Sequence, residues 1–447
     1  MPHTDADVSG GPGNDFLQGT SGDDTINGYA GNDTIEIGFP HTQTTYYYGP
    51  AGAGADTVHG GAGNDVIDAT YSFTRQGADV YKGSAIDAGD RIAGGAGYDT
   101  LYTTPVNFSS HILTSIEKIV VENSGLAESL PNGQIFLDAS NVAAGKTLVI
   151  DGHDASFAGH SGSHSYGLTI STNVLDSDLV LIGGGGPDSL SGGGGNDILI
   201  GGAGGDVLHG GDGDDVLSFT GDGAKVIDGG AGRDLLDLSD AAFSVNINLK
   251  ISGPQNLHGA RTQTISGIED VNGGSGNDHI VGNGSSNYLS GGAGNDVLKG
   301  GNGADTLDGG RGADALYGGS QRDAFVFSSA AVSTGANHDT IFAFNGSADS
   351  FELAVSVRAM DEKVVHGAAD EAHINVGLTD AIGAAQLRAH HAVLFTPDAG
   401  SLKGDTFLII DANGVAGYQT GKDIVIELVN ATHLGTLDAA SFHHLGS

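Results

Sequence analysis

The chain has 447 residues, of which 78 are glycine, 9 are proline and none is cysteine. Its 55 acidic residues outnumber 17 basic ones, and the formal net charge of −38 disfavours nucleic acid and anionic membrane surfaces and favours cations. The absence of cysteine excludes disulfides, thiolate zinc sites and cysteine nucleophiles. No apolar run is long enough to predict a membrane-spanning helix, and residues 1–30 have no pattern of an ordinary secretory signal peptide.

A nine-residue pattern, G-G-x-G-x-D-x-U-x with U apolar, recurs 18 times in three blocks. The first block covers 10–36 and 51–68, with a lone copy at 94–102. The second block covers 183–218 and 220–237, and the third runs without a break over 273–326. Position eight is apolar in every unit, and position six is Asp in 16 of them, with Lys225 and Asn287 as the exceptions.

Each unit combines a turn with a short strand. The glycine-rich half allows tight turns with positive φ, and the last three residues alternate as a strand does. Two consecutive units make one coil, and successive coils stack as parallel strands around a thin apolar interior. The sequence therefore predicts an all-β fold, with parallel β-roll or β-helix blocks, β inserts and a C-terminal β-rich cap.

Stacking brings together carboxylates that are two units apart in the sequence. The predicted pairs are Asp15/Asp33, Asp188/Asp206, Asp197/Asp215, Asp278/Asp296, Asp296/Asp314 and Asp305/Asp323. These charges would repel one another without a counter-ion. Carboxylate and carbonyl oxygens in such turns favour Ca²⁺ over Mg²⁺ or Zn²⁺.

The nonapeptide units resemble RTX (repeats-in-toxin, haemolysin-type) calcium-binding β-roll repeats. The resemblance implies several Ca²⁺ ions held by position-six side chains and by carbonyls of the glycine turns. The residues it assigns to metal are Asp15, Asp24, Asp33, Asp56, Asp65, Asp99, Asp188, Asp197, Asp206, Asp215, Asp234, Asp278, Asn287, Asp296, Asp305, Asp314 and Asp323. Lys225 cannot ligate calcium, and Phe219 is an extra residue between Asp215 and Asp234, which predicts an irregular site there.

Six segments are predicted. They are the first block with its loop (1–102), a β-rich insert (103–182), the second block (183–237), a short β insert (238–272), the third block (273–326) and a C-terminal cap with a secretion region (327–447). Strand-like stretches at 113–122, 134–140, 146–152, 166–172, 243–251 and 264–271 predict that both inserts continue the solenoid.

The C-terminal region, from 318–353 onward, is similar to that of secreted RTX proteins and serralysin-type proteases. This resemblance implies a β-rich cap ahead of an uncleaved type I secretion signal. Ala, Gln, Leu and Arg at helical spacing predict a helix over 380–394. In 409–419, Asp411, Asn413 and Gly414 suggest either a small calcium loop or a hairpin turn.

No catalytic residues are predicted. HExxH and G-x-S-x-G are absent, and G-x-G-x-x-G occurs only within the repeats. His153, His160 and His164 with Asp151 and Asp154 suggest either a metal or substrate site or a solvated loop. Tyr46–Tyr48 suggest either a sugar-stacking surface or an alternating strand.

The sequence favours a secreted calcium-binding protein, extracellular or at the cell surface, that is non-enzymatic and structural and folds on binding calcium. Two alternatives stay open: an adhesin or glycan-binding protein using 37–50 or 103–182, and a polysaccharide-active enzyme with its site in an insert. The expected partners are calcium, a type I secretion apparatus and a cell-surface glycan or further copies of the chain. No nucleic acid and no membrane span are expected.

Overall fold

The computed structural model describes residues 6–19, 24–37, 57–75, 79–84, 86, 90–103, 113–121, 133–137, 147–152, 168–172, 177–220, 223, 225–258 and 262–445. The chain divides into two compact units. The first contains residues 1–235 and 263–267, and the second contains 236–262 and 268–447. Each unit groups several of the six predicted segments, whose boundaries remain predictions.

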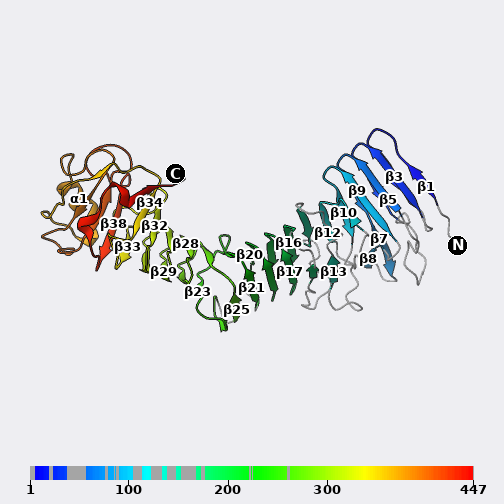
Figure 1. Cartoon of the computed structure of the whole chain (residues 1–447), viewed down its shortest axis with the longest axis horizontal. Helices are drawn as coiled ribbons and strands as arrows, with labels where there is room; N and C mark the ends of the chain where they lie inside the picture. Colours follow the sequence, from blue (N-terminus) through cyan, green and yellow to red (C-terminus); the bar gives the residue numbers. More distant parts are fainter. Residues whose placement is uncertain are drawn as a thin grey trace. The chain divides into compact units, whose positions relative to one another are not determined.

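The first unit is a stack of short parallel strands, and β3, β5 and β9 lie side by side in Figure 1. One set is β1 (Asp7–Ser9), β3 (Thr25–Ala30), β5 (Thr57–Ala62), β9 (Arg91–Ala96) and β11 (Leu113–Thr114). A second set is β2 (Phe16–Gln18), β4 (Thr34–Glu36), β6 (Val66–Asp68), β10 (Thr100–Thr103), β12 (Lys118–Val121), β14 (Leu148–Asp151), β16 (Leu179–Gly184), β18 (Ile198–Gly202) and β20 (Val216–Ser218). A third is β13 (Gly133–Leu137), β15 (Leu168–Thr172), β17 (Ser189–Gly194), β19 (Val207–Asp212), β21 (Val226–Ala231) and β25 (Gln263–Ser266).

The parallel stack confirms the predicted fold class. Leu199 pairs with Leu217 and Leu298 with Leu316, and in both pairs the partners are two repeats apart. The apolar position-eight side chain of every unit is buried, from Leu17 to Phe325. These side chains form the thin interior that the repeat pattern predicts.

The inserts also take part in the stack. Strands β12 and β14 continue the row of β10, and β13 and β15 continue into β17. In the first block the coils are interrupted, since Ile35 pairs with Ile67 and Ile67 with Leu101. An antiparallel hairpin, β7 (Thr70–Arg75) with β8 (Asp79–Ser84), lies within one of these interruptions. The two-repeat period therefore holds only where the chain makes no excursion.

The second unit repeats the same construction. One row is β26 (Asp270–Gly274), β28 (Tyr288–Ala293), β30 (Thr306–Arg311), β32 (Ala324–Phe327), β34 (Ser350–Leu353) and β39 (Phe442–His444). The facing row is β23 (Asn246–Asn248), β27 (His279–Val281), β29 (Val297–Asn302), β31 (Ala315–Ser320) and β33 (Asp339–Phe342). The short strands β22 (Leu235–Asp237) and β24 (Pro254–Gln255) complete the second block and the second insert.

The cap, residues 327–445, joins the facing row through β38. Strand β33 pairs in parallel with β38 (Ile424–Val429), followed by antiparallel β37 (Phe407–Ile410) and β36 (His391–Phe395), and then β35 (Ala359–Met360). Figure 1 shows α1 (Ile374–Ala381) beside this sheet. Ile374 and Leu378 of α1 belong to one buried cluster with Val393 and Phe395 of β36.

The helix predicted over 380–394 is wrong. The helix ends at Ala381, where Ile382 N–H donates to Leu378 O, and residues 391–395 form β36 instead. Ala392 to Phe395 are all buried and pair with β37, so sheet packing overrides the helical propensity of the preceding residues. None of the helices in the described parts of the chain is long and apolar enough to cross a membrane.

Candidate metal centre

The position-six carboxylates form ladders along the stacked turns. In each, the backbone N–H of one position-six residue donates to Oδ1 of the corresponding Asp in the next coil. Asp296 N–H, for example, donates to Asp314 Oδ1 at 2.8 Å, and Asp197 N–H donates to Asp215 Oδ1 at 2.8 Å. These bonds fix Oδ1 of each carboxylate against the backbone of the adjacent coil and direct Oδ2 into the turn.

That second oxygen, Oδ2, is buried and has no hydrogen-bond partner among the described residues at ten position-six aspartates. They are Asp33, Asp65, Asp99, Asp197, Asp215, Asp278, Asp296, Asp305, Asp314 and Asp323. A buried carboxylate oxygen without a donor or a cation is strongly unfavourable. The recurrence of the same orphaned atom in turn after turn indicates a missing cationic partner rather than a local irregularity.

Glycine creates the space beside each Oδ2. A Cβ added at Gly192 would collide with Asp197 Oδ2 and come close to the carbonyl oxygen of Gly210 in the next coil. A Cβ at Gly28 would collide with Asp33 Oδ2 and with Gly60 O. At these positions the missing side chain of glycine leaves a cradle bounded by a carboxylate and a carbonyl oxygen.

These donors fit calcium. No group of three or more His, Asp or Glu side chains that could hold a metal converges within the described ranges. The oxygens that line each cradle are a carboxylate Oδ2 and backbone carbonyls, the hard ligands that Ca²⁺ accepts in variable geometry.

Burial and neighbouring carboxylates change the acidity of these groups. Burial, followed by the charges of stacked aspartates, raises the pKa of Asp197, Asp215, Asp296 and Asp323 to about 7. Burial raises the pKa of Asp99 to about 6. Without a cation, the ionised carboxylates thus destabilise the folded turns at neutral pH.

All six predicted stacked pairs are confirmed as neighbours through these N–H to Oδ1 bonds. Asp33 contacts Asp65 and Asp65 contacts Asp99 in the same way, across 32 and 34 residues. Asp15 is half-buried and its Oδ2 accepts the Gly11 N–H, and Asp24 Oδ1 accepts the Ala6 N–H. Asp56, Tyr46–Tyr48 and His153, Asp154, His160 and His164 lie outside the described residues.

Phe219 shifts the register of the stacked strands here to 19 residues, as the sequence indicates, and the irregular site near 215–234 stays a prediction. Asp215 N–H donates to Asp234 Oδ1 at 2.9 Å in spite of the extra residue, Phe219, because Phe219 is buried between β20 and β21 without displacing the strands. At Asn287, the amide oxygen accepts the Asn283 N–H, and Nδ2 donates to Glu269 O. Its oxygen lies in the cradle of Gly282 and Gly300 O.

Three acidic residues outside the repeats extend the ladders. Asp99 N–H donates to Glu117 Oε2, Asp314 N–H donates to Asp339 Oδ1, and Asp323 N–H donates to Asp349 Oδ1. Burial raises the pKa of Asp339 to about 9. Asp90, buried directly before β9, is position six of a degenerate unit at 85–93. These residues could have been found in the sequence as acidic residues two positions before an apolar one, although the glycines of the repeat pattern are missing there.

A second ladder runs in the opposite direction at position five. Asn295 N–H donates to Asn277 Oδ1 at 2.9 Å, and Ala313 N–H donates to Asn295 Oδ1 at 3.0 Å. Asn14, Asn32 and Asn64 form the same series in the first block. These exposed amides satisfy backbone donors at the turns, a role that the repeat pattern did not predict.

The suggested calcium loop at 409–419 is occupied by hydrogen bonds. Strands β37 and β38 form a hairpin, and Asp411 Oδ1 accepts the N–H groups of Asn413 and Gly414. Asp423 accepts the Gln419 N–H at 2.7 Å and the Asn413 Nδ2 at 3.0 Å. These carboxylates organise the turn through backbone donors.

Comparison with known families agrees with this geometry. The model of the RTX calcium-binding nonapeptide repeat (4 copies) matches residues 9–38, 51–70, 84–103, 181–217, 264–298 and 290–325. These segments contain most of the stacked turns described above and the degenerate unit at 85–93, but they leave out the turns of Lys225 and Asp234 and the residues Glu117, Asp339 and Asp349. No curated protein matches the chain significantly. The chain therefore contains RTX nonapeptide repeats, which bind Ca²⁺ at multiple sites.

Proposed function

We propose that this protein is secreted, that its nonapeptide blocks fold when calcium binds, and that it serves as a non-enzymatic structural element of a cell surface or extracellular matrix. The observation that carries the proposal is the series of buried Oδ2 atoms, each beside a glycine cradle and without a donor. Calcium would neutralise these carboxylates where they are densest.

The proposed ligands are the position-six side chains of the repeats, together with glycine carbonyls of the same turns. We add Glu117, Asp339 and Asp349, because they continue the same ladders by the same N–H contacts. Lys225 is excluded. Asp56 is proposed as a ligand from the repeat pattern alone, because it lies outside the described residues.

Calcium concentration would then decide where the protein folds. Extracellular calcium modules have dissociation constants of about 10⁻⁴–10⁻³ M, so such sites are empty in the cytosol and filled outside the cell. Binding that occurs only in the folded state stabilises that state by mass action. The chain would pass through a secretion channel unfolded and fold after export.

Circular dichroism tests this coupling. In excess chelator the far-ultraviolet spectrum should be that of a largely unfolded chain, and millimolar calcium should restore the β-signal. A full β-signal in chelator, unchanged by calcium, would show that the metal does not fold the blocks.

Export is proposed to use a type I secretion apparatus and a serralysin-like C-terminal region. The support is the sequence from 318 onward, where the last repeat passes directly into the cap through β32, β33 and β34. Deleting the segment 388–447 should abolish export. Intact export of the truncated chain would refute this route.

Microscopy, glycan-binding assays and activity assays distinguish the structural role from the two alternatives, an adhesin and an enzyme. Calcium-dependent lattices or filaments of the purified protein would support a surface or matrix element. Selective binding on a glycan array, without assembly, would favour an adhesin. Turnover of an extracellular polysaccharide would favour an enzyme.

A further inference from the structure

Lys225 stands at position six of the unit TGDGAKVID, where other units carry Asp. Its side chain has no exposed surface, and it is the one lysine among the buried polar residues in the described part of the chain. A fully buried ammonium requires compensating partners. The contacts of Lys225 Nζ therefore show what this residue does.

The ammonium has three partners from the coil around it. Lys225 Nζ donates to Asp206 Oδ2 at 2.7 Å and to Gly204 O at 2.7 Å. It also lies 4.8 Å from the ring centroid of Phe219, within the range of a cation–π contact. The cation is thus held by a carboxylate oxygen and a glycine-turn carbonyl, the same two kinds of ligand that line the calcium cradles.

The neighbouring turns provide the comparison. Asp197 and Asp215 have an Oδ2 without a donor, whereas Asp206 Oδ2 is paired with Lys225. The other contact has the same form, because Asp206 Oδ1 accepts the Asp188 N–H at 3.0 Å just as Asp215 Oδ1 accepts the Asp197 N–H. Only the partner of the inward oxygen differs.

We propose that Lys225 is a tethered counter-ion that replaces one calcium ion between Asp206 and Gly204. This turn then binds no calcium ion of its own, and its order depends on calcium only through the neighbouring coils. Phe219, the extra residue of this coil, covers the ammonium with its ring. The inference rests on the proposed calcium binding of the neighbouring turns.

A turn with its own cation would favour folding of the coils beside it. In a stack, each coil contacts only its neighbours, so an ordered coil lowers the cost of ordering the next one. The turns around Asp206 and Lys225 should therefore become ordered at a lower calcium concentration than turns in the third block, such as that of Asp296.

Bound-calcium counts test the replacement directly. Asp206→Asn and Asp296→Asn make the same chemical change in two position-six residues of the intact chain. Equilibrium dialysis in calcium should show no ion lost from the Asp206 variant and at least one lost from the Asp296 variant. An equal loss from both would overturn the proposal.

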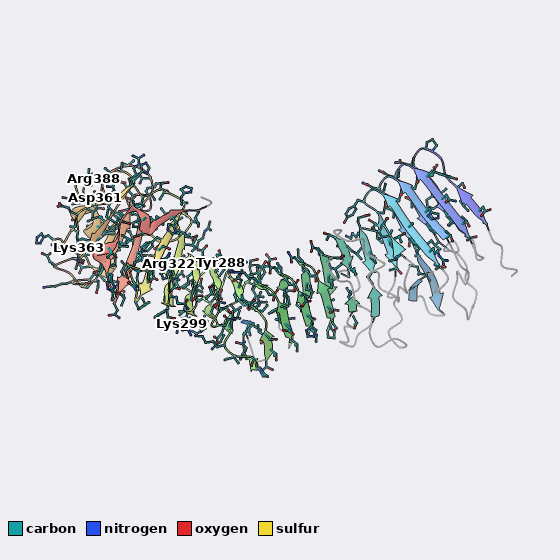
Figure 2. The ribbon with its side chains drawn as sticks, in the orientation of Figure 1. Tyr288, Lys299, Arg322, Asp361, Lys363 and Arg388 are labelled. Carbon is teal, nitrogen blue, oxygen red and sulfur yellow. The ribbon has the colours of Figure 1, made fainter. Side chains whose placement is uncertain are left out.

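Hydrogen exchange across a calcium titration tests the consequence. Lys225→Met should raise the calcium midpoint for protection of amides 206–209 and 226–229 by at least roughly 10-fold, because it leaves a buried carboxylate unpaired. Lys299→Met is the matched control (Figure 2), since Lys299 also lies over an aromatic ring, that of Tyr317, but on strand β29. An unchanged midpoint in the Lys225 variant would overturn the proposal.

A double variant covers the case in which Lys225→Met does not fold. Asp206→Asn combined with Lys225→Met removes both charges and should restore calcium-dependent folding, and its failure to do so would also count against the ion pair. Calcium-insensitive exchange at amides 278–281 of the wild type would instead refute the proposed function. In that case, faster exchange of amides 206–209 and 226–229 in the Lys225→Met variant in chelator would still show that Lys225 stabilises its turn.

Discussion

Buried aspartates differ in their hydrogen bonding between the repeat blocks and the cap. In the blocks, Asp296 uses one oxygen for a backbone N–H and leaves the other buried without a donor. In the cap, Asp423 uses both oxygens, which accept N–H groups from Gln419, Ala412 and Asn413. A buried aspartate therefore lacks a hydrogen-bond partner for one oxygen in the blocks, whereas both of its oxygens accept hydrogen bonds in the cap.

The hydrophobic cores of the two regions differ in the same sense. Each repeat contributes one buried apolar residue at position eight, whereas the cap packs α1 against a sheet through a cluster that includes Ile374, Leu378 and Phe395. Asp361 is held there by Arg388, beside it in Figure 2, and by His391. The cap has an apolar core like that of an ordinary globular domain, whereas the blocks bury carboxylate oxygens that have no hydrogen-bond donor.

The largest expected effect is therefore regional unfolding on calcium removal. In excess chelator, hydrogen exchange should become fast in the block strands, such as β18 and β29, while β36, β37 and β38 retain protection. Magnesium should not restore the blocks, because it demands a smaller and more regular coordination shell. Equal exchange rates in the blocks and the cap would contradict the proposed difference between these two regions.

Matched substitutions give the next effect. Asp296→Asn in the third block should lower the bound-calcium count and weaken folding only when calcium is present. Asp423→Asn in the cap should leave the count unchanged and cost about 1–3 kcal/mol, with or without calcium, because one of the two oxygens that accept N–H groups becomes an NH2 group. Dialysis and denaturant titration in both conditions measure the two quantities. A calcium loss from the Asp423 variant would show that the cap also holds a metal.

How much the sequence predicts depends on the region. In the blocks, the residue types at positions one, six and eight each have one physical task, so the pattern predicts the strands, the core and the Asp296–Asp314 contact. The contact of Asp33 with Asp65 was not predicted, because the period fails when the chain leaves the stack and returns. Asp339 and Asp349 were missed for a similar reason, since they keep the carboxylate without the glycines.

The cap was less predictable because long-range packing decides its local structure. Residues 391–395 follow a stretch with helical spacing, yet they become β36 since the neighbouring strand β37 offers both backbone partners and an apolar face. Asp411 and Asn413 have the residue types of a calcium loop, and only the positions of their backbone donors show that they stabilise a turn.

Proton release gives a smaller effect that is specific to the blocks. In the metal-free fold the pKa of Asp296 is raised to about 7 from its usual 3.8, so the folded chain binds more protons than the unfolded chain between those values. Stability of the metal-free blocks should thus fall as pH rises from about 4 to about 7. Calcium binding to blocks that are already folded without metal should release protons at pH 6 and few at pH 8.5, which calorimetry in buffers of different ionisation enthalpy measures. Equal release at both values would contradict this prediction.

The smallest expected effect separates the two ladders of the turn. Asn295→Ala removes the acceptor of the Ala313 N–H but keeps the donor contact of residue 295 with Asn277 Oδ1. Residue 295 is exposed, so water can replace the lost amide, and the cost should be about 0.5–1.5 kcal/mol. The bound-calcium count should not change, in contrast to Asp296→Asn one residue later. A lost calcium ion in the Asn295 variant would mean that position five helps to hold the metal, and the two ladders would then be one site rather than a structural ladder beside a metal ladder.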